Sequence, residues 1–134
     1  LDAVAEVELT SEDPDHPIEA ALLPGVGSGW RAAGSGEQTI RLLFPEPQRL
    51  RRIVLEFSEP LHARTQEFVL RWSPDGGGTF HEIVRQQWNF SPDGATSENE
   101  DVSVDLSDVT ILELSIKPDT GGGGIASLAR LRLA

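Results

Sequence analysis

The stretch Arg85-Gln86-Gln87-Trp88-Asn89 places a guanidinium, three amides and an indole in five consecutive residues. An indole packs on the apolar face of a sugar ring, while amides and guanidinium groups bond to the hydroxyls of that ring. Alternatively, Trp88 caps the core and the amides satisfy the backbone groups of the following loop. We therefore treat Trp88, Arg85, Gln87 and Asn89 as candidate ligand-binding residues, and the direction of the Trp88 ring decides between the two interpretations.

Arg64 and Gln66 open the strand that is expected to form a hairpin with the strand carrying Arg85. Antiparallel pairing would bring Arg64 or Gln66 toward Gln87 and its neighbours, so Arg64 and Arg85 could flank one site. The alternative is an ion pair of either arginine with Glu67 or Glu82, which at a surface is worth about 0 to 1 kcal/mol.

Two further candidates lie in segments expected to be loops or loop exits. His62 falls in the loop just before Arg64 and joins the candidate ligand-binding residues. Trp30 follows a Gly-Ser-Gly run at the point where the chain re-enters the domain. We expect Trp30 to plug one end of the core and keep ligand contact as the alternative.

The elements that must position these residues are strands. Period-two alternation of β-branched and aromatic residues recurs between clusters of Pro, Gly, Asp and Ser, whereas helix-period patterns are scarce. The chain is therefore predicted to be all-β. The predicted strands are residues 4–9, 38–44, 52–57, 66–72, 80–87, 101–106, 110–117 and 127–133.

The predicted connections alternate between short and long. The short ones are residues 45–50, 74–79 and 107–109, and the long ones are residues 10–37, 58–65, 88–100 and 118–126. If successive strands are antiparallel, the four long loops gather at one end of the domain. Binding residues concentrate on loops held by a rigid scaffold, so this loop end is where we expect the site.

Composition limits the remaining options. The 134 residues are expected to form one domain over residues 1–134, and the formal net charge of −11 disfavours nucleic acid and anionic lipid as partners. The chain has no cysteine and no apolar run long enough to cross a membrane, so membrane insertion is not expected. It begins at Leu1 and lacks methionine, which is typical of a module excised from a longer protein. The compartment is left open.

Catalytic patterns are weak. The acidic pairs, such as Glu12 with Asp13, are expected to be solvated charges in loops. Acid–base catalysis needs a shielded pair with perturbed pKa values. The serines lack the strand-turn-helix context of a nucleophile. We therefore expect no enzyme activity.

The segment EFVLRWSPDGGGTFHEIV, residues 67–84, resembles the central hairpin of discoidin-like domains. This group includes coagulation-factor type C domains and galactose-binding carbohydrate-binding modules. Trp30, the strand beginning QTIRL, the strand IVL at residues 53–55 and a final strand at residues 128–133 fit the same plan. The resemblance covers most of the chain from about Trp30 onward. It implies an eight-stranded antiparallel jelly-roll β-sandwich of the galactose-binding-domain-like type, which binds a ligand at its loop end without chemistry.

Many discoidin-like domains also hold a structural calcium ion in an Asp-rich run before the tryptophan. Here the corresponding residues 20–29 contain no carboxylate. The nearest carboxylates, Asp13, Asp15 and Glu19, remain calcium candidates, because calcium takes six to eight oxygen ligands. A zinc site built from His16 and His62 with one of the two aspartates is a weaker alternative.

The sequence thus favours a non-catalytic binding module whose most probable ligand class is carbohydrate. The second hypothesis is a protein-interaction or assembly module that uses the same loop end or a sheet face. It rests on Arg85-Gln86-Gln87, a run polar enough to face solvent within a regular strand.

Overall fold

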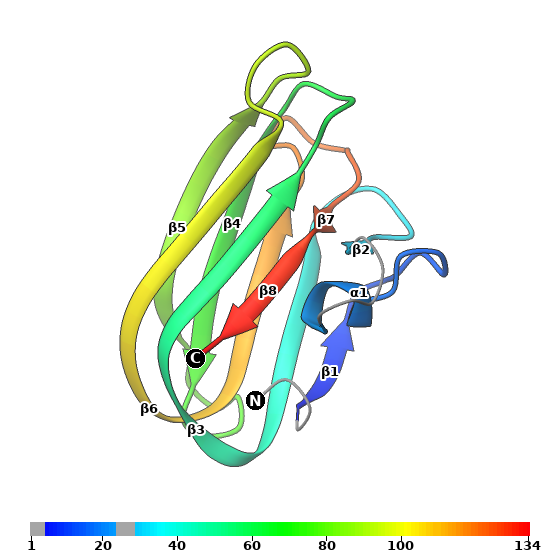
Figure 1. The fold of residues 1–134 in the computed structure, drawn as a ribbon. Coiled ribbons are helices and arrows are strands. Elements are labelled where there is room, and N and C mark those ends of the chain that lie inside the picture. The colour runs from blue at the N-terminus through cyan, green and yellow to red at the C-terminus, as the bar shows by residue number, and fades with distance from the viewer. Residues whose placement is uncertain (1–4, 24–28) are drawn as a thin grey trace.

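A computed structural model of the chain describes residues 5–23 and 29–134. It is almost entirely β-structure, as the sequence predicts (Figure 1). The elements in chain order are β1 (Glu6–Leu9), α1 (Glu19–Leu22), β2 (Trp30–Arg31), β3 (Gln38–Ser58), β4 (Arg64–Ser73), β5 (His81–Phe90), β6 (Ser97–Lys117), β7 (Ser127–Leu128) and β8 (Arg130–Leu133).

Two very long strands, β3 and β6, form the frame. They pair antiparallel from Gln38 opposite Ile116 to Ser58 opposite Ser97, with register shifts between Leu43 and Arg52. The prediction of separate strands at 38–44 and 52–57, and at 101–106 and 110–117, is therefore wrong. The expected turns at 45–50 and 107–109 are bends within continuous strands. Their turn-type residues produce irregular pairing instead of chain reversal, and Asp108 takes a positive φ of 60° at one such bend.

The bends divide the strands between two layers. One layer has the strand order β1-β3-β6-β4-β5. The other layer contains β8, the second half of β3 and the first half of β6, and in it β3 pairs with both β8 and β6. The alternating apolar residues of β3, including Ile40, Leu42, Ile53 and Leu55, are buried. Phe57 contacts Phe68 of β4 with 5.3 Å between ring centroids, and this contact packs the layers together. The antiparallel β-sandwich is thus confirmed.

The loops that follow β3, β5 and β6 gather at one end of the sandwich together with the segment between β2 and β3, whereas the loop after β1 lies to the side, next to α1 and β2 (Figure 1). Backbone hydrogen bonds tie these loops to one another. The Glu59 N–H donates to the Thr96 carbonyl at 2.7 Å, and the Gly36 N–H donates to the Gly124 carbonyl at 3.0 Å. The loop end is therefore a connected structure rather than a set of independent loops.

The predicted loop 10–37 contains two short elements, α1 and β2. Trp30 of β2 pairs with Leu128 of β7, and the predicted strand 127–133 is interrupted at Ala129. At Gly29, with φ of 110°, a Cβ atom would lie 2.6 Å from the Leu128 carbonyl oxygen. Glycine before Trp30 therefore allows this close approach of two backbones.

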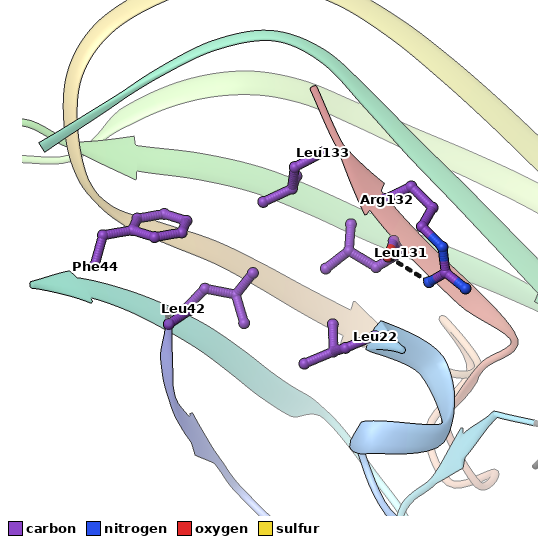
Figure 2. A pocket seen from close by; sticks show the side chains of 7 residues that line it. Leu22, Leu42, Phe44, Leu131, Arg132 and Leu133 are labelled. Carbon is purple, nitrogen blue, oxygen red and sulfur yellow. Dashed lines mark hydrogen bonds between the residues drawn. The ribbon is translucent and has the colours of Figure 1, made fainter. Parts of the chain in front are cut away.

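A small apolar gap of about 100 Å³ lies between the layers near the C-terminus (Figure 2). Ala5, Leu22, Leu42, Phe44, Leu131 and Leu133 line it together with Arg132. The Arg132 Nη1 donates to the carbonyls of Ala21 and Leu131 at 2.7 and 2.9 Å. This arginine therefore fastens α1 to β8 beside the apolar gap.

Candidate functional site

A buried arginine organises the loop end. Arg64, the first residue of β4, donates from Nε to Glu59 Oε1 at 2.9 Å and from Nη1 to the Pro118 carbonyl at 2.6 Å. Its guanidinium carbon also lies 4.8 Å from the centre of the Phe90 ring. Arg64 thus joins the loop after β3, the loop after β6 and the end of β5.

The polar network continues inward from Arg64. Its Nη1 also donates to Gln66 Oε1 at 3.0 Å, and Gln66 Nε2 donates to Glu98 Oε1 at 3.2 Å. Gln66 and Glu98 are almost completely buried. Two atoms in this network, Arg64 Nη2 and Glu98 Oε2, have no hydrogen-bond partner in the described part of the chain. The remaining hydrogen bonds hold their members in place, because moving one member would leave its buried partners without a bond.

The two buried glutamates are in opposite electrostatic states. Burial disfavours ionisation of Glu59, but hydrogen bonds from Arg64 and from the Leu61 N–H outweigh it and hold the pKa of Glu59 below its usual value. Burial raises the pKa of Glu98 to about 8, and the neighbouring Glu100 carboxyl adds to that shift. At neutral pH the loop end therefore contains an ionised Glu59–Arg64 pair and a protonated Glu98.

Above the Glu59–Arg64 pair lies a pocket of about 260 Å³. Its walls come from β2, from the loop between β3 and β4, and from the loop after β6. The lining residues are Arg31, Glu59, Leu61, His62, Ala63, Arg64, Asp119, Gly124 and Ile125. We refer to this hollow as the loop-end pocket.

The loop-end pocket combines apolar and polar surface. Leu61 and Ile125 expose 69% and 38% of their surface, which makes them two of the three large exposed hydrophobic residues in the described ranges. Asp119 accepts a hydrogen bond from the Gly121 N–H at 3.1 Å and keeps further acceptor capacity. Arg31 and His62 add donors. This mix suits a small polar ligand that also has an apolar face.

The candidate residues of β5 lie elsewhere. Arg85 and Gln87 are on the outer face of the larger layer, where both donate to the Glu67 carboxylate at 3.1 Å. Arg85 also pairs with Glu82 at 3.0 Å, so the ion-pair interpretation of Arg85 is confirmed. A bulge in the β4–β5 pairing puts Glu82 opposite Arg71 and Arg85 opposite Val69, and for this reason Glu82 and Arg85 share a face.

Trp88 occupies the other face of the same strand. It pairs in register with Gln66, in the row that faces the core, yet it is 36% exposed because β5 is the edge strand. Asn89 returns to the outer face and accepts from the Thr65 hydroxyl at 2.7 Å. Phe90 is buried.

Arg64 and Arg85 therefore do not flank one site. Arg64 is in the buried row of β4 and pairs with Glu59, whereas Arg85 is exposed on the outer face and pairs with Glu67 and Glu82. Strand alternation separates them. Of the predicted ligand-binding residues, the loop-end pocket brings together Arg64 and His62, with Gln66 in the network beneath them.

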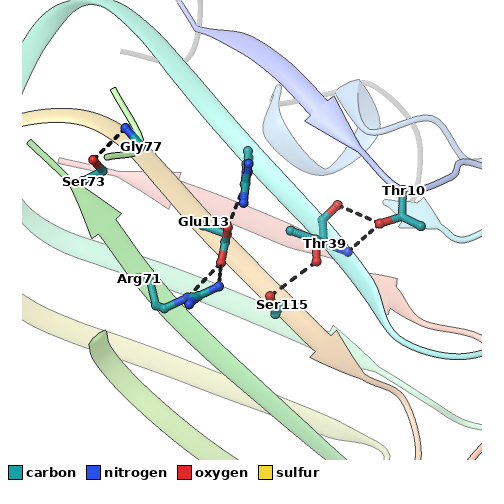
Figure 3. Close-up of polar contacts among 8 residues, drawn as sticks. Thr10, Thr39, Arg71, Ser73, Gly77, Glu113 and Ser115 are labelled. Atoms are coloured by element: carbon teal, nitrogen blue, oxygen red, sulfur yellow. Dashed lines mark hydrogen bonds and ion pairs between the residues drawn. The ribbon is translucent and has the colours of Figure 1, made fainter. Parts of the chain in front are cut away.

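The outer face also has a polar groove of about 290 Å³. Its residues are Glu37, Glu67, Val69, Arg71, Glu82, Arg85, Ser115 and Lys117. Beside it the buried Glu113 accepts from Arg41 Nε at 2.7 Å and from Arg71 Nε at 2.8 Å, and it also pairs with Arg71 Nη2 (Figure 3). The guanidinium carbons of Arg41 and Arg71 lie 5.4 and 5.3 Å from the centre of the Phe80 ring. These charges mainly satisfy one another.

Trp30 is 1% exposed, and its Nε1 donates to the Ser11 carbonyl at 3.1 Å. The expectation that it plugs the core is therefore confirmed. Asp13 Oδ1 accepts from the Asp15 N–H at 2.9 Å, and Glu19 lies in the first turn of α1. Within residues 5–23 and 29–134, no three His, Asp or Glu side chains are grouped to hold a metal ion. The calcium site stays a prediction.

Sequence reasoning missed Leu61, Ile125, Arg31 and Asp119. The signal for the first two was present, since each is a large aliphatic residue within a loop of small or polar residues. Arg31 and Asp119 carried no such signal. Their positions depend on the pairing of β2 with β7 and on the path of the loop after β6.

Comparison with solved structures supports the fold. The chain resembles a pectin-binding carbohydrate-binding module, with 16% identity, a TM-score of 0.68, and coverage of 97% of this chain and 89% of that one. It also resembles a family 32 module of NanJ from Clostridium perfringens in complex with galactose, with 14% identity, a TM-score of 0.70, and coverage of 98% and 94%. A third similar structure is CpGH89CBM32-5 from the same organism, in complex with GalNAc-β-1,3-galactose. The identity is 19% and the TM-score 0.68, and the match covers 98% of this chain and 96% of that one.

The chain has the galactose-binding-like sandwich fold. At the level of fold, the resemblance to discoidin-like domains is thereby confirmed. No family model and no curated protein matches the sequence. In the described part of the chain, no helix is long and apolar enough to span a membrane.

Proposed function

We propose that this chain is a non-catalytic carbohydrate-binding module whose ligand occupies the loop-end pocket. The observation that carries the proposal is the pocket itself, in which exposed Leu61 and Ile125 adjoin Arg31, His62 and Asp119 above a fixed Glu59–Arg64 pair. The fold is shared with modules solved in complex with galactose and with GalNAc-β-1,3-galactose, and this supports the ligand class.

Each group has a role that follows from its chemistry. Leu61 and Ile125 offer aliphatic surface to the C–H face of a sugar, while Asp119 accepts from hydroxyls. Arg31 and His62 donate to hydroxyl or ring oxygens. Arg64 is already engaged by Glu59 and Pro118, so its main effect is to hold the loops that carry the other groups.

A non-catalytic role is consistent with the carboxylates of the pocket. Glu59 is held ionised by Arg64, so it is a poor proton donor at neutral pH. Glu98, with its pKa of about 8, is buried beneath the pocket and is absent from its lining. A glycosidase needs a proton donor and a second carboxylate, and Glu59, one of the two carboxylates that line the pocket, is held ionised by Arg64.

The proposal is tested by screening the protein on a glycan array and titrating the best glycan by calorimetry. We expect His62→Ala and Leu61→Ser to weaken binding by about tenfold or more, the loss of one hydrogen-bonded or well-packed contact. Trp88→Ala is the matched control, since it removes an exposed large side chain outside the pocket, and it should bind normally.

Two results would contradict the proposal. The first is a blank array with folded protein. The second is binding that survives both pocket substitutions but is lost in Trp88→Ala, which would move the site to β5.

A further inference from the structure

Strand β5 is a free edge of the larger layer. Among the residues that the structure describes it pairs with β4 only, and it is ten residues long. The strand at the opposite edge, β1, has four residues. An edge strand presents unpaired N–H and C=O groups along its length, so a long edge offers a much larger template for pairing than a short one.

The usual protections of an edge are missing from most of β5. The strand has no proline and no lysine, Arg85 is the one charged residue between Val84 and Phe90, and the single bulge falls at the start of the strand, between Glu82 and Val84. From Val84 to Phe90 the pairing with β4 is regular. The core-facing row of this segment contains Val84, Gln86 and the partly exposed Trp88, without a charge pointing inward. Such an edge favours pairing with another strand.

The sequence of β5 is self-complementary at a register centred on Gln86. Two copies related by a two-fold axis perpendicular to the sheet pair antiparallel, and the residue on the axis faces its own copy. An axis at Arg85 would set two guanidinium groups against each other. An axis at Gln86 sets Val84 opposite Trp88 twice, Gln86 opposite Gln86, and Arg85 opposite Gln87. That register matches apolar with apolar and places no like charges directly opposite.

We propose that β5 pairs with β5 of a second copy of this chain, centred on Gln86. The two larger layers then form one continuous antiparallel sheet. Because the strands are antiparallel, the two loop-end pockets lie at opposite ends of the dimer. The inference goes beyond carbohydrate binding and does not depend on it.

The net charge of the chain opposes this association and predicts how the dimer responds to salt. Each chain carries a formal net charge of −11, so two copies repel each other. Added salt screens the repulsion between the copies. The dimer is therefore expected to strengthen with salt, whereas contacts based on opposite charges weaken.

The test is sedimentation velocity across a concentration series at low and moderate salt. The wild-type protein should form a dimer that salt strengthens. Gln86→Lys and Gln86→Glu each set like charges against each other on the axis, and each should weaken the dimer by more than about tenfold. An equimolar mixture of the two variants should restore the dimer, because Lys then faces Glu.

Asn99→Lys is the matched control, since Asn99 is an exposed amide on β6 away from the proposed seam. It should leave the dimer intact. A wild-type protein that stays monomeric at every concentration overturns the proposal, as does a dimer that both Gln86 variants retain or that the mixture fails to restore. Unaltered urea midpoints show that the variants fold. Glycan titration of Gln86→Lys, expected to match wild type, separates this result from the fate of the loop-end pocket.

Discussion

The loop end and strand β5 both bring arginine, glutamine and aromatic residues together, but they use these residues differently. At the loop end the Arg64 side chain is 3% exposed and touches Glu59, Gln66, Pro118 and Phe90. On β5 the Arg85 side chain is 54% exposed, and its partners are surface carboxylates. The loop end gathers residues from separate parts of the chain into one network, whereas β5 sends its consecutive residues to two opposite faces.

The difference shows how a similar local composition produces two kinds of surface. A strand alternates its side chains, so Arg85, Gln87 and Asn89 cannot share a concave site with Trp88. Loops at one end of a sandwich can converge, and the buried Glu59–Arg64 pair holds them together. The loop end is thus suited to enclose a small ligand, and β5 is suited to present an edge to another strand.

The largest expected difference between the two regions is in stability. Arg64→Met leaves the Glu59 carboxylate and the Pro118 carbonyl without their partner, so we expect it to lower the free energy of unfolding by about 3 kcal/mol or more. Arg85→Met, the matched change on β5, should leave the urea midpoint unchanged. Equal losses in the two variants would show that the loop-end network has no special role in stability.

The second prediction concerns pH. Because the folded state raises the pKa of Glu98 to about 8, it binds this proton more tightly than the unfolded chain does. The free energy of unfolding should therefore fall as pH rises from the ordinary glutamate range to about 8. Glu98→Gln should remove this slope and stabilise the protein at about pH 8 by about 1 to 3 kcal/mol.

Urea unfolding of both proteins across that pH range measures the effect. Glu82→Gln, a change at an exposed carboxyl of β5, is the control and should keep the wild-type slope. A slope that persists in Glu98→Gln would locate the titrating group elsewhere.

The third prediction compares two exposed arginines in ligand binding. Arg31 lines the loop-end pocket and Arg85 lies on the outer face of the larger layer. We expect Arg31→Ala to weaken glycan binding by about tenfold, as the loss of one charged hydrogen bond would. Arg85→Ala should bind as wild type in the same titration. The reverse result would place the ligand on the outer face.

The smallest effect is expected at the ion pairs beside the outer groove. Glu113 is buried, but Arg41 and Arg71 are about two-fifths exposed, so water stabilises both arginines when the carboxylate is removed. Glu113→Gln should lower the free energy of unfolding by about 1 kcal/mol, with unchanged glycan affinity. Thermal unfolding and calorimetry on one sample measure both. A large loss of affinity would link this groove to the ligand.

The alternating residues Ile40, Leu42, Ile53 and Leu55 were enough to predict the inner faces of the strands. Side chains two positions apart in a strand lie on the same face of the sheet, so apolar residues at every second position mark the face that packs in the core. Continuity was not predictable in the same way. Pro45 and Asp108 look like turn residues, but each lies in a bend of a strand whose partner bends with it. Only the long-range pairing of β3 with β6 distinguishes a bend from a turn.

For the candidate site, Arg64 and His62 were identified from the sequence because they fall where a long loop meets a strand. The sequence also grouped Arg85, Gln87 and Asn89 with them, and these residues lie close to Trp88 in the chain but on the other face of β5, outside the loop-end pocket. Neighbours in sequence are a poor guide to a site on a strand, whereas the residues that converge on one pocket come from β2 and from the loops after β3 and β6.

The sequence by itself determined the all-β class, the buried rows and the gathering of long loops at one end, because alternation and turn residues act over short distances along the chain. The tertiary structure alone decided which side chains meet at that end. Arg64 becomes the centre of a network only when Glu59, Pro118 and Phe90 are brought around it. Trp88 is 36% exposed because β5 has no neighbour on its outer side among the described residues. Both outcomes depend on strand order, which pairing between distant segments fixes.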